Sequence, residues 1–378
     1  MTPPTKRRLT IGLIVLLLAA VYMARIRDGM ADFAVGHQAG QRLAAGETLY
    51  QTGDGHYMFK YLPFSAILYL PFAALPLEVA KPAWFGLSIV AMLAMCGLAA
   101  RLVSDRGARY LSIVPALILA KYFLHELRLG QINILVTLIM MLAALALTRP
   151  GIRQALVAGA LAGLATALKP YAALLFLYFI VTRRWTSAAA GLGVLLGALV
   201  IPTIFYGVAG NADVLRQWAG TLSASTPELL GSNDNVSVIA FFTKWTGDPT
   251  HALPLTGLVL GVLALLTLAV VIKGEGRTKS PVLESALVLT LIPLVSPLGW
   301  DYTFPMSLLA TALLVHHLRA FPVVVQGVLV VNFAIVALAL YDVMGREAYS
   351  TFMQWSVTTV NFLVIVGGLI YLRFRRVC

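Results

Sequence analysis

One carboxylate in this sequence stands where it could act as a base. Asp32 follows the first long apolar run, at the start of a helix-like stretch that would lie on a membrane surface. A carboxylate held there can take the proton from a hydroxyl group, which is general-base chemistry. Asp32 could equally cap the helix, because an Asp at a helix start accepts backbone N–H hydrogen bonds and complements the helix dipole. The two roles are compatible, and the sequence leaves both open.

One cation interrupts an apolar sequence. Lys169 separates the apolar residues 165–168 from the apolar run 170–181. A lysine at the end of a membrane span can extend its ammonium group into the polar interface, which requires no function. A lysine that faces a cavity can instead bind a phosphate through charge-assisted hydrogen bonds. Pro170 begins the next helix, so the turn here also has a structural cause.

A polar hairpin lies between two apolar segments and contains His125. Glu126 and Arg128 could simply pair with each other in it. Gln131 and Asn133, however, lie at the head of a span, where an amide that faced lipid would be expensive. We therefore expect both amides to face protein or a wet cavity.

A second polar turn runs from Ser296 to Tyr302. Its Trp300 and Tyr302 could belong to the aromatic belt at the membrane interface, whereas Asp301 in that setting calls for a function. Together with the residues above, these side chains converge on one side of the membrane. The complete set of candidates is Asp32, His37, Lys60, Tyr61, His125, Arg128, Gln131, Asn133, Lys169, Asn235, Trp300, Asp301 and Tyr302.

Sequence patterns of cofactor sites are missing. The sequence has no Gly-rich nucleotide loop, no Walker pattern and no His/Cys cluster with metal-ligand spacing. We expect no metal and no cofactor. An enzyme with no nucleotide site on this face would need a substrate that is carried by a lipid or supplied from outside.

The elements that position these residues are membrane helices. Of the 378 residues, 60% are hydrophobic and only 12% are charged, about half the charge of a soluble domain. The net charge of +12 comes largely from short basic runs between apolar segments, so it indicates membrane topology and not a nucleic-acid partner. The surrounding partners are membrane lipids. We expect an all-α, polytopic helix bundle that forms a single integral membrane domain over residues 1–378.

The apolar segments predict twelve spans with both termini in the cytoplasm. A span needs about 20 apolar residues, and the segments are 9–24, 84–103, 110–124, 131–148, 154–168, 170–182, 186–207, 252–272, 281–296, 304–317, 321–341 and 356–372. The ambiguous stretch 62–80 is assigned to the interface, because its crossing would move most of the inner basic residues outside, against the positive-inside rule. The inner residues are then Lys6, Arg7, Arg8, Arg101, Arg106, Arg109, Arg149, Arg153, Arg183, Arg184, Lys273, Arg277, Lys279, Arg319, Arg373, Arg375 and Arg376.

Two sizeable segments then lie outside, at residues 25–82 and 207–253. In the first, Phe33, Gly36, Gly40 and Leu43 share one face, which suits a helix on the membrane surface. The stretch 62–80 would be a second interfacial element. In the other segment, residues 236–245 are expected to form a short interfacial helix.

The ordered motifs of these segments resemble glycosyltransferase family 87. The first outer segment has Asp32-Phe33, then Gly46-Glu47-Thr48-Leu49-Tyr50, then Phe59-Lys60-Tyr61-Leu62-Pro63. Further matches, in the family's order, are Gly130-Gln131-Ile132-Asn133, Gly163-Leu164-Ala165 with Lys169-Pro170, Asn235-Val236-Ser237, and Ser296-Pro297 with Trp300. They cover about residues 25–302, and the ordered set is far more specific than any single motif.

The resemblance implies a fold of the GT-C type and an inverting transfer of a hexose. The donor would be a sugar on a polyprenyl phosphate, most often mannose, and the acceptor a glycolipid or glycan on the outer face of the cell inner (plasma) membrane. Asp32 matches the general base, and Lys169 and residues 130–133 match donor-side positions. Family members often place a His after the Ser-Pro and Trp motif, where this sequence has Asp301 and Tyr302.

Physical chemistry extends these assignments. Arg128 and Lys169 could supply the cations near the leaving phosphate, and His125, Gln131 and Asn133 are grouped with them as donor-binding candidates. The remaining residues of the set are candidates for the acceptor or the pocket. The leaving phosphate departs already charged, so the reaction requires no metal. The main alternative is a transporter or flippase of lipid-linked sugars, although such proteins usually show internal repeats and broken helices at mid-membrane.

Overall fold

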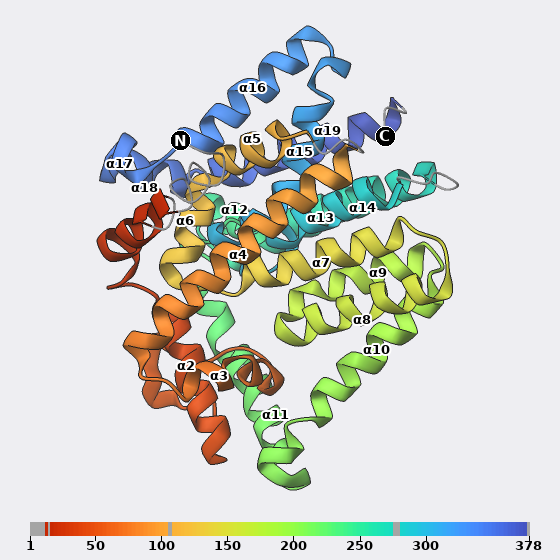
Figure 1. Cartoon of the computed structure of the whole chain (residues 1–378). Helices are drawn as coiled ribbons and strands as arrows, with labels where there is room; N and C mark the ends of the chain where they lie inside the picture. The colour runs from red at the N-terminus through yellow and green to blue at the C-terminus, as the bar shows by residue number, and fades with distance from the viewer. Residues whose placement is uncertain (1–11, 14–15, 105–107, 275–279, 376–378) are drawn as a thin grey trace, which may run out of the picture.

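The computed structural model describes residues 12–13, 16–104, 108–274 and 280–375, and every regular element within these ranges is helical (Figure 1). The predicted all-α class is therefore confirmed. Lys6, Arg7 and Arg8, which carry the prediction of a cytoplasmic N-terminus, lie outside the described residues.

The chain is an integral membrane protein, and three of its described helices can each cross a membrane by length and composition. They are α4 (Leu77–Val103), α13 (Pro249–Gly274) and α19 (Val357–Phe374). Two more pairs qualify but are bent, α5 (Tyr110–Ile118) with α6 (Ala120–Leu129) by 71°, and α10 (Trp185–Val200) with α11 (Thr203–Leu229) by 90°. The count of twelve spans stays a prediction, because the other apolar helices have 10–17 residues and a crossing needs about 20.

Shorter helices complete the bundle. They are η1 (Tyr22–Ile26), α7 (Asn133–Leu147), α8 (Ile152–Leu168), η4 (Pro170–Ala173), α9 (Leu174–Val181), α14 (Ser280–Val295), η5 (Asp301–Ser307), α15 (Leu308–His316), η6 (Leu318–Ala320), α16 (Val323–Leu338), α17 (Tyr341–Met344) and α18 (Arg346–Gln354). Many large apolar side chains on α10, α13 and α16 are exposed, such as Leu258 at 66% and Val324 at 79%. In a membrane protein, exposed apolar side chains of this kind form surface that lipid can cover.

Small residues bring α8 and α10 into close contact. A Cβ atom added at Gly159 would lie 2.1 Å from the carbonyl oxygen of Ser187, and one at Gly163 would lie 2.3 Å from that of Gly191. Small residues four apart on facing helices let two backbones approach, which is a common packing mode in membranes. This contact sets the position of α8, which ends beside Lys169.

The first outer segment folds onto itself. It comprises α2 (Ala31–Ala45), η2 (Thr52–Tyr57), η3 (Pro63–Tyr69) and α3 (Leu70–Ala73). The predicted helix face of α2 is confirmed: its four residues, Phe33 to Leu43, are buried, and Gly36 lies directly against the ring of Tyr69. The apolar stretch 62–80 is not one helix, because it breaks after Ala73, and α4 begins at Leu77 and not at the predicted residue 84.

The second outer segment is more helical than expected. α11 continues to Leu229 beyond a break at Gly207, whose φ of 67° is the left-handed conformation that favours glycine. The short helix predicted from 236 to 245 is observed as α12 (Val238–Thr246). Trp218 of α11 donates a 3.2 Å hydrogen bond to the backbone oxygen of Lys60, so the two outer segments are in contact.

Candidate active site

Asp32 lies in the first turn of α2 but does not cap it. The cap position is Met30, in a left-handed conformation, and no side chain caps this helix end. Met30 donates its backbone N–H to the carbonyl oxygen of Arg128 at 2.6 Å, which ties the start of α2 to the end of α6. The prediction that Asp32 caps the helix through hydrogen bonds is therefore wrong, because Asp32 is the second residue of α2 and its carboxylate turns toward Gln131. Its place in the first turn still complements the helix dipole.

The side chain of Gln131 connects Asp32 to Lys169. Its amide nitrogen donates to Asp32 Oδ2 at 2.8 Å, and its amide oxygen accepts from Lys169 Nζ at 3.0 Å and from the Tyr61 hydroxyl at 3.2 Å. These partners fix the orientation of the amide, since only its nitrogen can donate and only its oxygen can accept. The expectation that Gln131 faces protein is confirmed.

Lys169 is a buried cation. Its exposed fraction is 6%, and Nζ donates to the Tyr61 hydroxyl at 3.0 Å while lying 4.3 Å from the centre of the Tyr61 ring. Burial raises the pKa of Tyr61, so its hydroxyl keeps its proton. A lysine that extended toward the interface would expose its ammonium group, so the prediction of a lysine that snorkels at the end of a span is wrong. In the described ranges, no carboxylate lies within ion-pair distance of Lys169.

Glu126 organises a second layer behind this network. Its carboxylate accepts from Asn133 Nδ2 at 2.7 Å and from the backbone N–H of Ile134 at 3.0 Å. Asn133 in turn accepts a 2.5 Å hydrogen bond from the Tyr171 hydroxyl. The suggested pair of Glu126 with Arg128 is wrong, because Glu126 is 1% exposed and faces the start of α7 while Arg128 points to the surface.

Sequence reasoning gave no role in the site to Glu126 or Tyr171. The available signal was the place of Glu126 in the hairpin that leads into α7, because a carboxylate is favourable near the N-terminus of a helix.

Asp301 and His125 lie close together beside two aromatic rings. His125 Nδ1 lies 2.9 Å from Asp301 Oδ1. The imidazole packs edge-on against Tyr302 at 5.5 Å, and Tyr302 stacks with Trp300 at 6.4 Å. The turn after Trp300 has Asp301 in the sequence and no histidine. His125 of α6 lies beside this turn and contacts Asp301.

Asn235 holds two outer turns together. Its side chain donates to the Pro297 oxygen at 2.9 Å and accepts from the backbone N–H groups of Ser237 and Gly299, both at 3.1 Å. Asn235 is fully buried, and its backbone pairs with that of Trp300 in a single antiparallel β-bridge. Its side chain is therefore occupied by hydrogen bonds that shape the two turns, and it does not face the network around Asp32.

Two other candidates are placed differently. Lys60 is half-buried, and burial lowers its pKa while the charges of Asp32 and Glu228 raise it, so Lys60 belongs to the rim of the network. His37 is turned away, because its Nε2 lies 3.0 Å from the Leu75 oxygen.

The structure therefore brings together Asp32, Tyr61, Gln131 and Lys169. It places His125, Trp300, Asp301 and Tyr302 in a second group, and it does not bring the side chains of His37, Arg128 and Asn235 to the network.

This arrangement can bind an anion and take a proton. Asp32 is half-buried, one of its oxygens is held by Gln131, and the other has no hydrogen-bond partner among the described residues. Lys169 uses two of its three donors within the chain. Among the described residues, no group of three or more His, Cys, Asp or Glu side chains could hold a metal ion.

Comparisons with known proteins relate the chain to membrane glycosyltransferases. The profile of the family described as glycosyltransferase family 87 matches residues 59–297. A polyprenol-phosphate-mannose-dependent alpha-(1-2)-phosphatidylinositol pentamannoside mannosyltransferase of Mycolicibacterium smegmatis is 26% identical over 334 residues, covering 85% of this chain and 76% of that protein.

Two crystal structures of ArnT from Cupriavidus metallidurans are also similar. The one bound to undecaprenyl phosphate is 14% identical, with a TM-score of 0.42 over 96% of this chain and 77% of that one. The apo structure gives the same identity and TM-score over 98% and 78%.

Proposed function

Since this chain belongs to glycosyltransferase family 87, we propose that it transfers mannose from a polyprenyl-phosphate donor to a glycolipid or glycan acceptor, with inversion and with Asp32 as general base. The donor class agrees with the relative that uses polyprenol-phosphate-mannose. The family membership makes the chain a polyprenyl-phosphate-sugar-dependent glycosyltransferase; the sugar, the acceptor and the roles of residues are the proposal.

One observation carries the mechanism: Gln131 binds Asp32 and Lys169 at the same time. Two hydrogen bonds and the width of one amide separate Asp32 Oδ2 from Lys169 Nζ by at most about 8 Å. A base and a phosphate-binding cation are therefore held at a fixed separation, on rigid elements, as an in-line displacement requires.

The proposed reaction uses this geometry. The acceptor hydroxyl gives its proton to the partner-free oxygen of Asp32 while its oxygen attacks the anomeric carbon. The bond between that carbon and the phosphate oxygen breaks, and the phosphate leaves with the electron pair. Lys169 stabilises the charge on the departing phosphate. Attack from the face opposite the phosphate inverts the anomeric configuration.

The second group, Trp300 and Tyr302 with the His125–Asp301 pair, is proposed to line the pocket for the sugar or the acceptor. We further propose that this end of the bundle faces the outside of the plasma membrane and that both termini are cytoplasmic. The basic residues between the opposite helix ends support this orientation.

Purified protein tests the function directly. Incubation with polyprenyl-phosphate-mannose and candidate acceptors should release polyprenyl phosphate, and a deletion strain should lack one hexose on the natural acceptor by mass spectrometry. A transporter would move the labelled donor across a vesicle membrane without cleaving it, and that result would overturn the proposal.

A further inference from the structure

A groove opens between α7 and α8, at the end opposite to the candidate active site. α7 leaves the site at Asn133 and α8 returns to it at Lys169, so Arg153 lies about 24 Å from Lys169 along the helix. The groove has a volume of about 410 Å³. Its wall includes Leu142, Ala146, Arg149, Arg153, Val157 and Leu161.

The groove combines an apolar wall with two positive charges. The side chains of Arg149 and Arg153 are exposed, and within the described ranges neither forms an ion pair. Acidic residues are scarce at this end of the bundle. Two of them, Asp105 and Glu275, lie outside the described residues. The described acid at this end is Glu284, which is buried and lies 3.3 Å from Arg373. Among the described residues, no acid therefore competes with an anion for the arginine pair.

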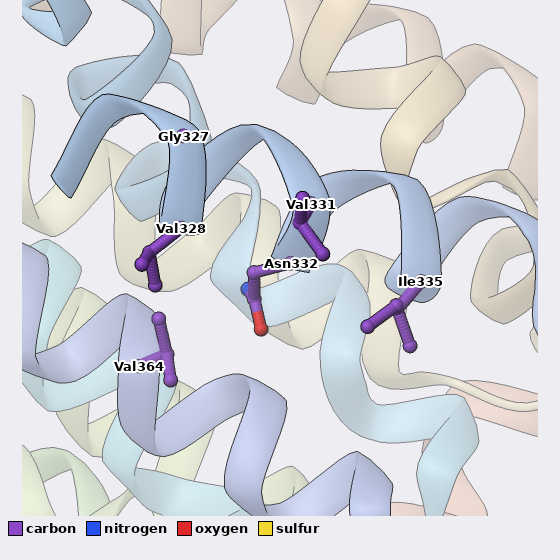
Figure 2. Close-up of a pocket in the computed structure, with 6 residues that line it drawn as sticks. All are labelled: Gly327, Val328, Val331, Asn332, Ile335 and Val364. Atoms are coloured by element: carbon purple, nitrogen blue, oxygen red, sulfur yellow. The ribbon is translucent and has the colours of Figure 1, made fainter. Parts of the chain in front are cut away.

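A second groove provides an internal comparison. It lies between α16 and α19 and has a volume of about 400 Å³ (Figure 2). Its lining residues are Gly327, Val328, Val331, Asn332, Ile335 and Val364, none of which is charged. This groove therefore offers no charged side chain to a lipid head group. The two grooves have similar volumes, so the arginine pair is what sets the α7–α8 groove apart.

We propose that the α7–α8 groove binds one anionic phospholipid from the leaflet opposite to the active site. An acyl chain lies along Leu142, Val157 and Leu161, and the phosphate contacts Arg149 and Arg153. Arginine suits this role because its planar guanidinium binds phosphate through two hydrogen bonds. Basic pockets between membrane helices attract anionic head groups for the same reason. A zwitterionic lipid binds more weakly, because its ammonium group meets the same two arginines.

Native mass spectrometry of the full-length, delipidated protein tests the charge requirement. Dioleoylphosphatidylglycerol should bind the wild type with at least about tenfold higher affinity than Arg149→Gln/Arg153→Gln, and dioleoylphosphatidylcholine should bind both equally weakly. Arg101→Gln/Arg319→Gln is the matched control, because it removes two exposed charges from the same end outside the groove. The control should bind phosphatidylglycerol like the wild type. Equal losses in both variants would mean general surface attraction and would overturn the proposal.

Filling the groove tests its shape independently of charge. Ala146→Phe keeps both arginines and should still lose phosphatidylglycerol. Gly327→Phe fills the uncharged groove, where an added Cβ atom would have no neighbour within 4 Å, and should leave phosphatidylglycerol binding unchanged. Each variant must also unfold at the wild-type temperature in detergent without added lipid, which separates lost binding from lost folding. Retained binding in folded Ala146→Phe would show that the lipid lies elsewhere.

Discussion

The amide nitrogen of Gln131 donates a 2.8 Å hydrogen bond to the carboxylate of Asp32. The bond holds one oxygen of Asp32 in place and leaves the other without a partner in the part of the chain that the structure describes. The same amide accepts from Lys169, so Gln131 links the carboxylate to the ammonium group. The predictions below separate their roles.

Asp32→Asn should fold and bind donor normally but lose transfer by at least about a hundredfold, because an amide cannot accept the hydroxyl proton. Asp32→Glu should recover little, since an error of about 1 Å in the position of a base can cost about 10²-fold. Single-turnover assays of purified variants measure both. Near-normal turnover of Asp32→Asn would remove Asp32 from the mechanism.

Lys169→Ala should weaken donor binding about ten- to a hundredfold, the expected effect of one lost charge-assisted contact to phosphate. Arg128 is the matched control. The sequence predicts a phosphate contact for it too, but its side chain lies at the surface, so Arg128→Ala should have the smaller effect. Titration with polyprenyl-phosphate-mannose measures both affinities. Equal donor affinity in wild type and Lys169→Ala would place the phosphate elsewhere.

Asp301 and His125 should act as one unit. If Asp301 works by orienting His125, Asp301→Ala and His125→Ala should each reduce transfer, and the double variant should be little worse than the more damaging single one. The coupling expected for residues in contact is about 0.5–3 kcal/mol. Additive losses in this double-mutant cycle, measured as kcat/KM, would show that the two residues act separately.

Gly163→Leu should destabilise the bundle, because its side chain would enter the backbone of α10. Overpacking of this kind costs about 1–3 kcal/mol or more. Gly193→Leu is the control, since an added Cβ atom there would have no neighbour within 4 Å. Thermal unfolding in detergent should show a lower midpoint for Gly163→Leu alone. A wild-type midpoint for that variant would argue against the close α8–α10 contact.

Cysteine labelling tests the topology. In a background without Cys96 and Cys378, cysteines at Ser104 and Gly274 should react with an impermeant reagent only from the cytoplasm, and one at Ser232 only from outside. This pattern follows if 62–80 does not cross the membrane, and its helical part, Pro63–Ala73, is too short to cross fully. Labelling of Ser104 from outside would refute the twelve-span arrangement.

The sequence by itself determined the class of the fold and the chemistry to look for. Its apolar segments predict helices because a chain in lipid must satisfy its backbone hydrogen bonds internally, and the ordered motifs identify the family before any contact is known. Expensive polar residues such as Gln131 and Lys169 stand out against an apolar background, so their importance is visible without a structure. The face of α2 was also predictable, because Phe33, Gly36, Gly40 and Leu43 recur at the three- and four-residue spacing of a helix.

Only the tertiary structure decided which polar groups meet. When a helix is apolar on all sides, its sequence does not indicate which side faces the neighbouring helices. Contacts such as that of Gly163 with Gly191 therefore orient α8 and place Lys169, which directly follows it. The bond between Gln131 and Asp32 joins residues 99 positions apart, and no local pattern predicts such a pairing. For the same reason, the sequence suggested Arg128, which is close in the chain, as the partner of Glu126. In the folded protein the partner is Asn133.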